Sequence, residues 1–182
     1  MNPPYRRAAL GVALALGLLS VVPGVALAAN PACGTTIMTN VTLTSDMDCS
    51  AYDGDAIIFG KKNLTLNLNG YTLWGLVGND DDNGVYTNYK KNVTVKNGTI
   101  AYYDTAVYAE NTVGGVFKNL TITGDSEPYE EGIYIDEGAN NLITNNTIDD
   151  VGYGIDVEYG GGNWITNNTV TDAYDAFYIY IE

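Results

Sequence analysis

Residues 132–135, Gly-Ile-Tyr-Ile, and residues 145–148, Asn-Asn-Thr-Ile, belong to two short motifs that recur along the chain and decide its fold. Related tetrapeptides occupy residues 84–87, 106–109, 154–157 and 176–179 for the first motif, and residues 97–100, 119–122 and 167–170 for the second. A third column of apolar residues consists of Val95, Phe117, Ile143 and Ile165. Neighbouring copies in every column lie 22 residues apart, except for one shared interval of 26. Three columns with one period and one interruption indicate a structural repeat.

Each repeat contains three short segments rich in Val, Ile, Thr and Tyr, separated by Gly, Asn and Asp. Alternation of apolar and polar residues predicts strands, and no stretch after residue 28 has a helical period. A 22-residue unit cannot bury its apolar face alone, so it must stack on its neighbours at the ~4.8 Å spacing of strands. We therefore predict an all-β parallel solenoid with about five to six coils of 22 residues.

Stacking turns the columns into ladders of side chains. One inward ladder consists of Val85, Val107, Ile133, Ile155 and Phe177, and a second of Thr87, Ala109, Ile135, Val157 and Ile179. A looser, earlier coil begins near Ile57 and Ile58 and continues through Leu64, Leu66 and Leu68. These residues are the predicted core.

The segments Gly132–Ile135 and Asn140–Ile148 resemble the repeats of the pectate-lyase-like superfamily, and are closest to those of periplasmic copper-maturation and carbohydrate-active β-helix proteins. The resemblance covers roughly Asn40 to Glu182 and implies a right-handed parallel β-helix. That scaffold hosts lyases, hydrolases, adhesins and phage spikes, so it implies no single function. The superfamily's lyases generally use an Arg or Lys base beside calcium, and its pectin hydrolases pair aspartates with a histidine. Residues 29–182 contain no Arg and no His, so neither motif can be carried over.

The first 28 residues are predicted to be a cleaved signal peptide, because Arg6 and Arg7 precede an apolar run from Ala8 to Val22 and a small-x-small site at residues 26–28. An uncleaved N-terminal anchor is the alternative. We expect a secreted protein, extracellular, periplasmic or at the cell surface, with no membrane segment in its mature form. Beyond residue 28, six lysines against 22 acidic residues give a net charge of −16, which argues against nucleic acid as a partner.

We expect a cap segment at residues 29–55 and the β-helix at residues 56–182. The cap holds the two cysteines, Cys33 and Cys49. In an exported protein they are predicted to form a disulfide.

Two insertions break the 22-residue period, at Gly75–Asn83 and Gly124–Glu131, and both fall at the same corner of the coil. Both are acidic, and carboxylate oxygens are the ligands that Ca²⁺ prefers. The candidate metal ligands are Asp80, Asp81, Asp82, Asp125 and Glu127. Calcium is the one cofactor considered, and a solvated acidic turn is the alternative.

Alternation sends Tyr86, Tyr108, Tyr134 and Tyr178 to the outside as a surface ladder, next to an acidic ladder that includes Glu110, Asp136 and Glu158. Such a face could bind a polysaccharide, contact another subunit, or stabilise the sheet through cross-strand pairs. Carboxylates on adjacent coils would lie close to the ~5–5.5 Å of a retaining glycosidase pair. If the protein is an enzyme, the candidates are Glu110, Asp136, Asp156 and Glu158, but we expect no catalysis.

Seven Asn-x-Thr triplets fit the N-glycosylation pattern. Their asparagines are Asn40, Asn63, Asn92, Asn97, Asn119, Asn145 and Asn167. Several of them share one corner of the coil, where asparagines also suit tight bends without any sugar.

The last residues form an apolar strand whose predicted assembly edge is Phe177, Ile179 and Ile181. We expect self-association through coil ends, head to tail, which gives a filament if the contact does not close. The alternative is that the sequence is a fragment. The expected function is a secreted, non-catalytic structural or surface protein, self-assembling and calcium-stabilised. The alternative hypothesis is a carbohydrate-binding or carbohydrate-cleaving β-helix protein.

Overall fold

The computed structural model describes residues 29–76 and 82–181, and the predicted signal peptide lies outside these residues. The described chain is built from strands without a helix. The strands are β1 (Thr35–Ile37), β2 (Val41–Thr42), β3 (Met47–Asp48), β4 (Ile57–Phe59), β5 (Thr65–Asn67), β6 (Thr72–Trp74), β7 (Asn83–Tyr86), β8 (Thr94–Ala101), β9 (Thr105–Glu110), β10 (Val116–Thr123), β11 (Glu131–Asp136), β12 (Leu142–Thr144), β13 (Thr147–Glu158), β14 (Trp164–Thr166) and β15 (Thr169–Tyr180). In the part that the structure describes, no helix is long and apolar enough to span a membrane.

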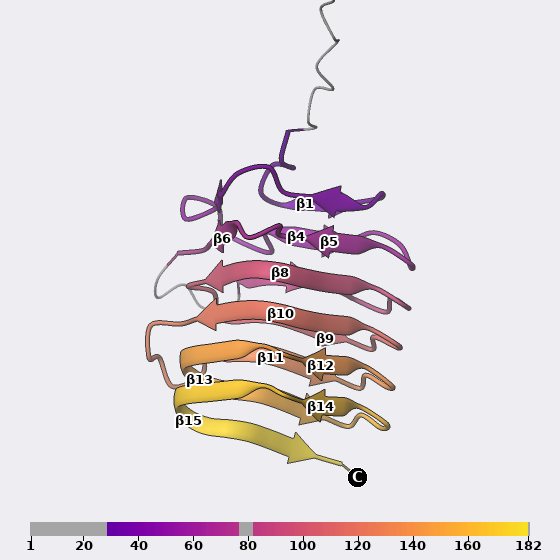
Figure 1. Ribbon diagram of the computed structural model, residues 1–182, viewed down its shortest axis with the longest axis vertical. Coiled ribbons are helices and arrows are strands. Elements are labelled where there is room, and N and C mark those ends of the chain that lie inside the picture. The colour runs from indigo at the N-terminus through magenta and orange to yellow at the C-terminus, as the bar shows by residue number, and fades with distance from the viewer. Residues whose placement is uncertain (1–28, 77–81, 182) are drawn as a thin grey trace, which may run out of the picture.

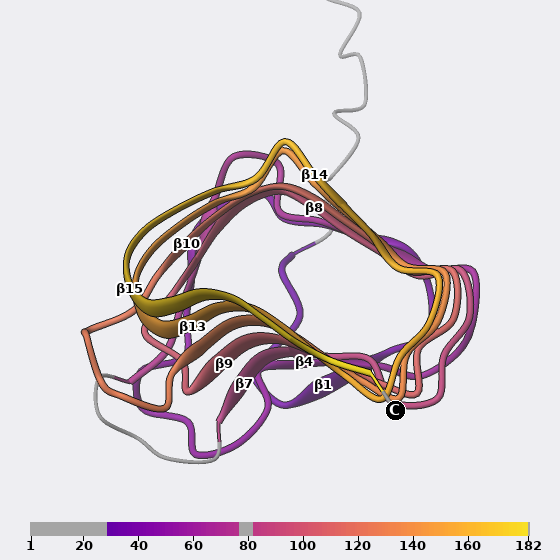
Figure 2. The ribbon, with the colours of Figure 1, turned by 90° about the horizontal axis from the view of Figure 1, so that it is seen from below.

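The strands stack as successive coils along the long axis of the molecule (Figure 1). Every recorded pairing is parallel, and Val107 pairs with Ile133 and Ile155 with Phe177, as the repeat predicts. The same holds on the second wall, where Phe117 lies between Val95 and Ile143. Seen along the axis, the coils superimpose as one closed outline (Figure 2). The predicted all-β parallel solenoid is confirmed, with about six coils.

The inward ladders form the core. Val85, Val107, Ile133 and Ile155 are fully buried, as are Phe117 and Ile143 on the second wall. Thr87 is the polar member of the second ladder and is also buried. Its hydroxyl is hydrogen-bonded to the Thr112 hydroxyl, 2.8 Å away, so burial leaves no unsatisfied group there.

Asparagines form one corner of the coil. Asn97, Asn119, Asn145 and Asn167 all have positive φ, between 52° and 60°. This left-handed conformation is tolerated better by Asn than by most residues, and it bends the chain between two strand segments. The Asn119 side-chain amide donates a hydrogen bond of 3.0 Å to Asn97, one coil away. The repeated asparagine therefore shapes the turn and links the coils.

A second corner lies at the start of the Gly-Ile-Tyr-Ile segment, where the pairing between coils skips one residue. Glu131 pairs with Tyr153 and Ile133 with Ile155, while Gly132 has no partner in this ladder. A side chain at Gly132 would point into the core, because its Cβ would lie 2.4 Å from the Gly154 carbonyl oxygen and 2.7 Å from Ile148. Two successive inward positions, Gly132 and Ile133, break the alternation and turn Glu131 to the outside.

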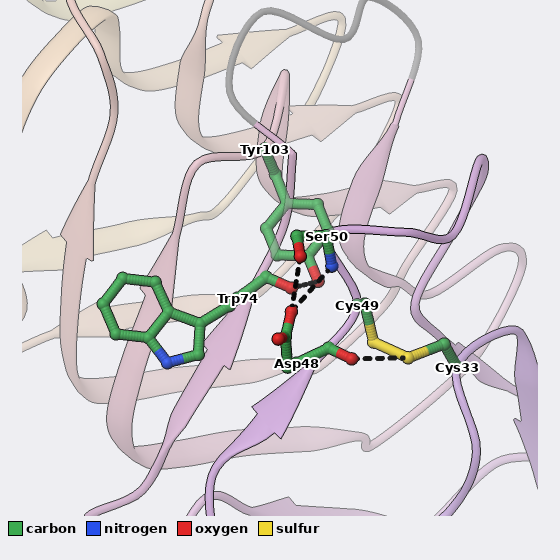
Figure 3. Close-up of a disulfide and its surroundings, with 6 residues drawn as sticks. All are labelled: Cys33, Asp48, Cys49, Ser50, Trp74 and Tyr103. Carbon is green, nitrogen blue, oxygen red and sulfur yellow. Dashed lines mark hydrogen bonds between the residues drawn. A yellow bond between two sulfur atoms is a disulfide. The ribbon is translucent and has the colours of Figure 1, made fainter.

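The N-terminal segment forms a first coil, in which β1, β2 and β3 pair with β4, β5 and β6. Cys33 and Cys49 form the predicted disulfide (Figure 3). Nearby, the Asp48 carboxylate accepts hydrogen bonds from the Ser50 amide and hydroxyl, which lower the pKa of Asp48. The Tyr103 hydroxyl donates to the Trp74 carbonyl oxygen at 2.9 Å, and so ties a later coil to this end.

Candidate functional site

The outer face of β7, β9, β11, β13 and β15 carries three parallel stripes of side chains. The corner stripe consists of Asn83, Thr105, Glu131, Tyr153 and Asp175. The tyrosine stripe consists of Tyr86, Tyr108, Tyr134, Asp156 and Tyr178. The acidic stripe consists of Glu110, Asp136, Glu158 and Tyr180. The predicted tyrosine and acidic ladders therefore lie next to each other on one surface.

Three tyrosines of the tyrosine stripe stack on one another. The ring centroids of Tyr86 and Tyr108 are 5.2 Å apart, and those of Tyr108 and Tyr134 are 5.0 Å apart with an interplanar angle of 4°. Both faces of the Tyr108 ring are therefore covered by neighbouring rings. This geometry is that of cross-strand aromatic pairing, and it leaves ring edges and hydroxyls, not ring faces, on the surface.

Each stacked tyrosine also donates its hydroxyl hydrogen to the acidic stripe one coil further on. Tyr86 donates to Glu110, Tyr108 to Asp136 at 3.3 Å, and Tyr134 to Glu158 at 3.1 Å. Burial and the neighbouring carboxylates raise the pKa of all three phenols, so they stay protonated donors. The three catalytic candidates Glu110, Asp136 and Glu158 are thus each engaged by a tyrosine.

Asp156 interrupts the tyrosine stripe between Tyr134 and Tyr178. Its side chain is only 5% exposed, and its Oδ1 has no hydrogen-bond partner in the described chain. Burial, followed by the charges of Glu158 and Asp136, raises the pKa of Asp156 to about 7. A buried carboxyl without a donor is costly to ionise, so Asp156 holds its proton into the neutral range.

Glu131 is a further carboxyl of this face, although in the sequence it belongs to the insertion at residues 124–131. The Thr105 hydroxyl donates to Glu131 at 2.9 Å. Burial is the main cause that raises the pKa of Glu131 to about 8, and the charges of Asp156 and Asp104 add to it. If Gly132 had been counted as a second inward residue before Ile133, the alignment of the repeats would have placed Glu131 on the outer face.

Glu131 lines an open groove of about 340 Å³ on the outer face. The groove is lined by Asn83, Asp104, Thr105, Tyr108, Glu131 and Tyr134. It spans β7, β9 and β11 and lies between the corner stripe and the tyrosine stripe. Its lining combines hydroxyls, an amide and carboxyls, a set suited to hydrogen-bonding a polar ligand.

The stacked parallel coils agree with the comparison to family models, in which the model described as "right handed beta helix region" matches residues 26–180. This chain belongs to the right-handed β-helix family. No curated protein and no solved structure matches it. The family defines the fold, and the function must be argued from the residues of this β-helix.

The two insertions of this β-helix share a corner, as predicted, since β6–β7 and β10–β11 connect the same two columns of the register. Asp80 and Asp81 lie outside the described residues. The Asp82 carboxylate accepts a hydrogen bond of 2.7 Å from the Gly54 amide. Within residues 29–76 and 82–181, no group of three or more Asp, Glu, His or Cys is arranged to hold a metal. The calcium site stays a prediction.

In the β10–β11 connection, Glu130 contacts the backbone of both candidate ligands, Asp125 and Glu127. The Glu130 carboxylate accepts hydrogen bonds from the backbone amides of Asp125 at 2.9 Å and Glu127 at 3.3 Å. Burial raises the pKa of Glu130 to about 7. These contacts give Glu130 a structural role in this loop.

The last described coil of the β-helix has an uncovered apolar edge. Phe177, Ile179 and Ile181 are 48%, 53% and 65% exposed, whereas Ile155, directly beside Phe177, is fully buried. The residues of the predicted assembly edge therefore do lie on one exposed edge.

The glycosylation candidates lie at coil corners. Six of the seven are exposed, and Asn97 is half-buried. The side-chain amide nitrogens of Asn92, Asn97 and Asn119 donate to other asparagines one coil away. Their role in linking coils accounts for these residues without a glycan.

Proposed function

We propose that this right-handed β-helix is an exported, non-catalytic structural or surface protein. The observation that supports this function is the use of the outer face. Tyr86, Tyr108 and Tyr134 stack on one another and donate their hydroxyl hydrogens to carboxylates of the next coil. Cross-strand contacts of this kind contribute roughly 0.2–1 kcal/mol each, and they make the coils a rigid stack. The face that could have carried chemistry is in large part engaged in holding coils together.

Export is supported by the disulfide between Cys33 and Cys49. Disulfides persist in oxidising compartments and are rare where thiols are kept reduced. Together with the signal sequence expected at residues 1–28, this supports a location outside the cytoplasm, in the periplasm, at the cell surface or in the medium. Mass spectrometry of the N-terminus of the protein recovered from its host would test cleavage after Ala28.

Self-association through coil ends is the assembly that we propose for this scaffold. Within the described residues β15 pairs with β13 alone, and a strand from a second copy could pair with its other edge and cover Phe177, Ile179 and Ile181. Head-to-tail contact of this kind grows into a filament if it does not close into a ring.

Light scattering after size-exclusion chromatography, over a hundredfold range of concentration, together with electron microscopy, would test the assembly. We expect Phe177→Asp to shift the protein to monomers. Leu76→Asp is the matched control, because Leu76 is 45% exposed and lies on an earlier coil. A wild-type monomer at every concentration, or equal assembly of both variants, would refute the proposal.

Carbohydrate binding is a second candidate, which the groove beside Glu131 favours. Carboxyl oxygens of the groove can accept hydrogen bonds from sugar hydroxyls, and ring edges of Tyr108 and Tyr134 border it. A glycan array would test binding, and a reducing-sugar assay would test cleavage. A signal in the array without release of reducing ends would support a binding protein, and silence in both would leave the structural function.

A further inference from the structure

Most side-chain donors of the groove are already used within the protein. Thr105 donates its hydroxyl hydrogen to Glu131, Tyr108 to Asp136 and Tyr134 to Glu158. The amide nitrogen of Asn83 donates to Asp55 at 2.6 Å. What the groove offers to a ligand is therefore chiefly acceptors. No described residue donates to the second carboxyl oxygen of Glu131.

The surroundings of the groove are negative. Asp104 and Glu131 line it, Asp156 lies on the tyrosine stripe, and Asp136 and Glu158 lie on the acidic stripe beyond it. The three stripes contain no lysine, and the chain has no arginine beyond residue 7. The lysines lie on other parts of the coil, namely Lys61, Lys62, Lys90, Lys91, Lys96 and Lys118. A uronic acid or another anionic sugar would be repelled here, whereas a cation would be attracted.

Asp156 lies one coil beyond Tyr134 of the groove lining and is a second sign that this surface lacks donors. Asp156 is buried, yet its Oδ1 has no donor within the described residues. The Asp156 and Asp104 carboxyls both raise the pKa of Glu131, which is itself half-buried. Carboxyls crowded in this way keep protons that a cationic ligand could replace.

We propose that the groove beside Glu131 binds a primary ammonium group carried by a sugar, that is, the free amine of an amino-sugar residue in a glycan. The inference rests on the carbohydrate-binding candidate above. The ammonium group supplies three donors and one positive charge to the acceptors of the groove, and the sugar hydroxyls donate to the remaining oxygens. If the amine arrives neutral, the Glu131 proton moves to its nitrogen, which yields the same carboxylate–ammonium pair without any other reactant.

Isothermal titration calorimetry with the full-length mature protein at pH 7 and 0.15 M salt tests the proposal. The probes are a glucosamine oligomer, its fully N-acetylated counterpart, and spermidine as a sugar-free polyamine. We expect the glucosamine oligomer to bind, and the acetylated oligomer and spermidine to bind at least about tenfold more weakly, because a charged hydrogen bond contributes about 1.5–3 kcal/mol.

Two variants locate the binding. Glu131→Gln keeps the shape of the side chain and removes the carboxyl that would pair with the ammonium group, and it should weaken binding of the glucosamine oligomer about tenfold. Asp149→Asn is the matched control, because Asp149 lies on the half of β13 that pairs with β10, and its carboxylate accepts from the Thr171 hydroxyl. It replaces a carboxyl by an amide away from the groove and should leave binding unchanged. Circular dichroism of both variants confirms that they fold, and Asp156→Asn, expected to weaken binding less than Glu131→Gln, replaces Glu131→Gln if that variant does not fold.

Each remaining outcome overturns the inference in a different way. Equal binding of both oligomers would refute ammonium recognition and leave carbohydrate binding intact. Spermidine binding as tight as that of the oligomer would show that the groove recognises charge without the sugar. Equal loss in Glu131→Gln and Asp149→Asn would show general attraction to an acidic protein. Silence with all three probes, while another glycan binds on the array, would refute the inference alone, and silence on the array as well would refute carbohydrate binding.

Discussion

Replacing Asp156 by Asn should make the protein more stable at alkaline pH and flatten its dependence of stability on pH. Asp156 is buried without a donor for Oδ1 within the described residues, and its pKa rises from the ordinary value of 3.8 to about 7. The folded protein therefore binds a proton between pH 4 and 7 that the unfolded chain releases. Its stabilising contribution is complete below about pH 4 and is lost as the pH rises through 7.

The magnitude follows from the same values. The difference between 3.8 and about 7 corresponds to about 4 kcal/mol at most, at 1.36 kcal/mol per pKa unit. Entry of water around the ionised group lowers this cost, so we expect about 2 kcal/mol. An asparagine carries no charge at any pH, so Asp156→Asn escapes the penalty. For a domain of this size the gain corresponds to roughly 4–8 °C in Tm at pH 8, and to little at pH 4.

Thermal unfolding followed by circular dichroism at pH 4 to 9 measures the effect. Asp149→Asn again serves as the control, since it changes the net charge equally. The expected result is a Tm difference between Asp156→Asn and wild type that grows with pH, with no such growth for Asp149→Asn. Parallel curves for Asp156→Asn and wild type across this range would refute the reasoning, because Asp156 would then be ionised in the folded protein at no cost.

Three further outcomes test other contacts. Tyr108→Phe, which loses the hydrogen bond to Asp136 and keeps the ring stack, should lower the free energy of unfolding by about 0.5–1.5 kcal/mol in chemical denaturation. An unchanged value would show that this bond does not stabilise the fold. Removal of the disulfide by Cys33→Ser with Cys49→Ser should cost roughly 3 kcal/mol in the same assay, and an unchanged midpoint would contradict the chain-entropy argument. Millimolar calcium should raise the Tm if the acidic corner binds it, whereas neither heat nor a Tm shift in a titration would remove that prediction.

The fold was predictable because every coil repeats one pattern. Val107, Ile133 and Ile155 lie at the same position of successive repeats. The alternation of apolar and polar residues around each of them predicts both the strand and its buried side. The disulfide could be predicted from two cysteines that follow a predicted signal peptide. The asparagine corner could also be expected, because Asn adopts positive φ more readily than other residues with a side chain.

The site was less predictable, because it depends on a departure from alternation. Gly132 and Ile133 both point inward, so the parity of the strand reverses between Glu131 and Tyr134. Simple alternation therefore gave no reason to place Glu131 next to the tyrosine stripe. The burial of Asp156 could not be predicted either, since alternation places this residue on the outer face together with the tyrosines.

The asparagine and tyrosine ladders also bear on how such a molecule could change in length. Each side chain of these ladders contacts only the coil before and the coil after its own, so its contacts do not depend on the total number of coils. Duplicating one 22-residue unit would extend the rod by ~4.8 Å and reproduce every contact at the new junctions. Duplication of repeats in the gene could therefore change the length of the β-helix in fixed steps, while the shape of each coil stays the same.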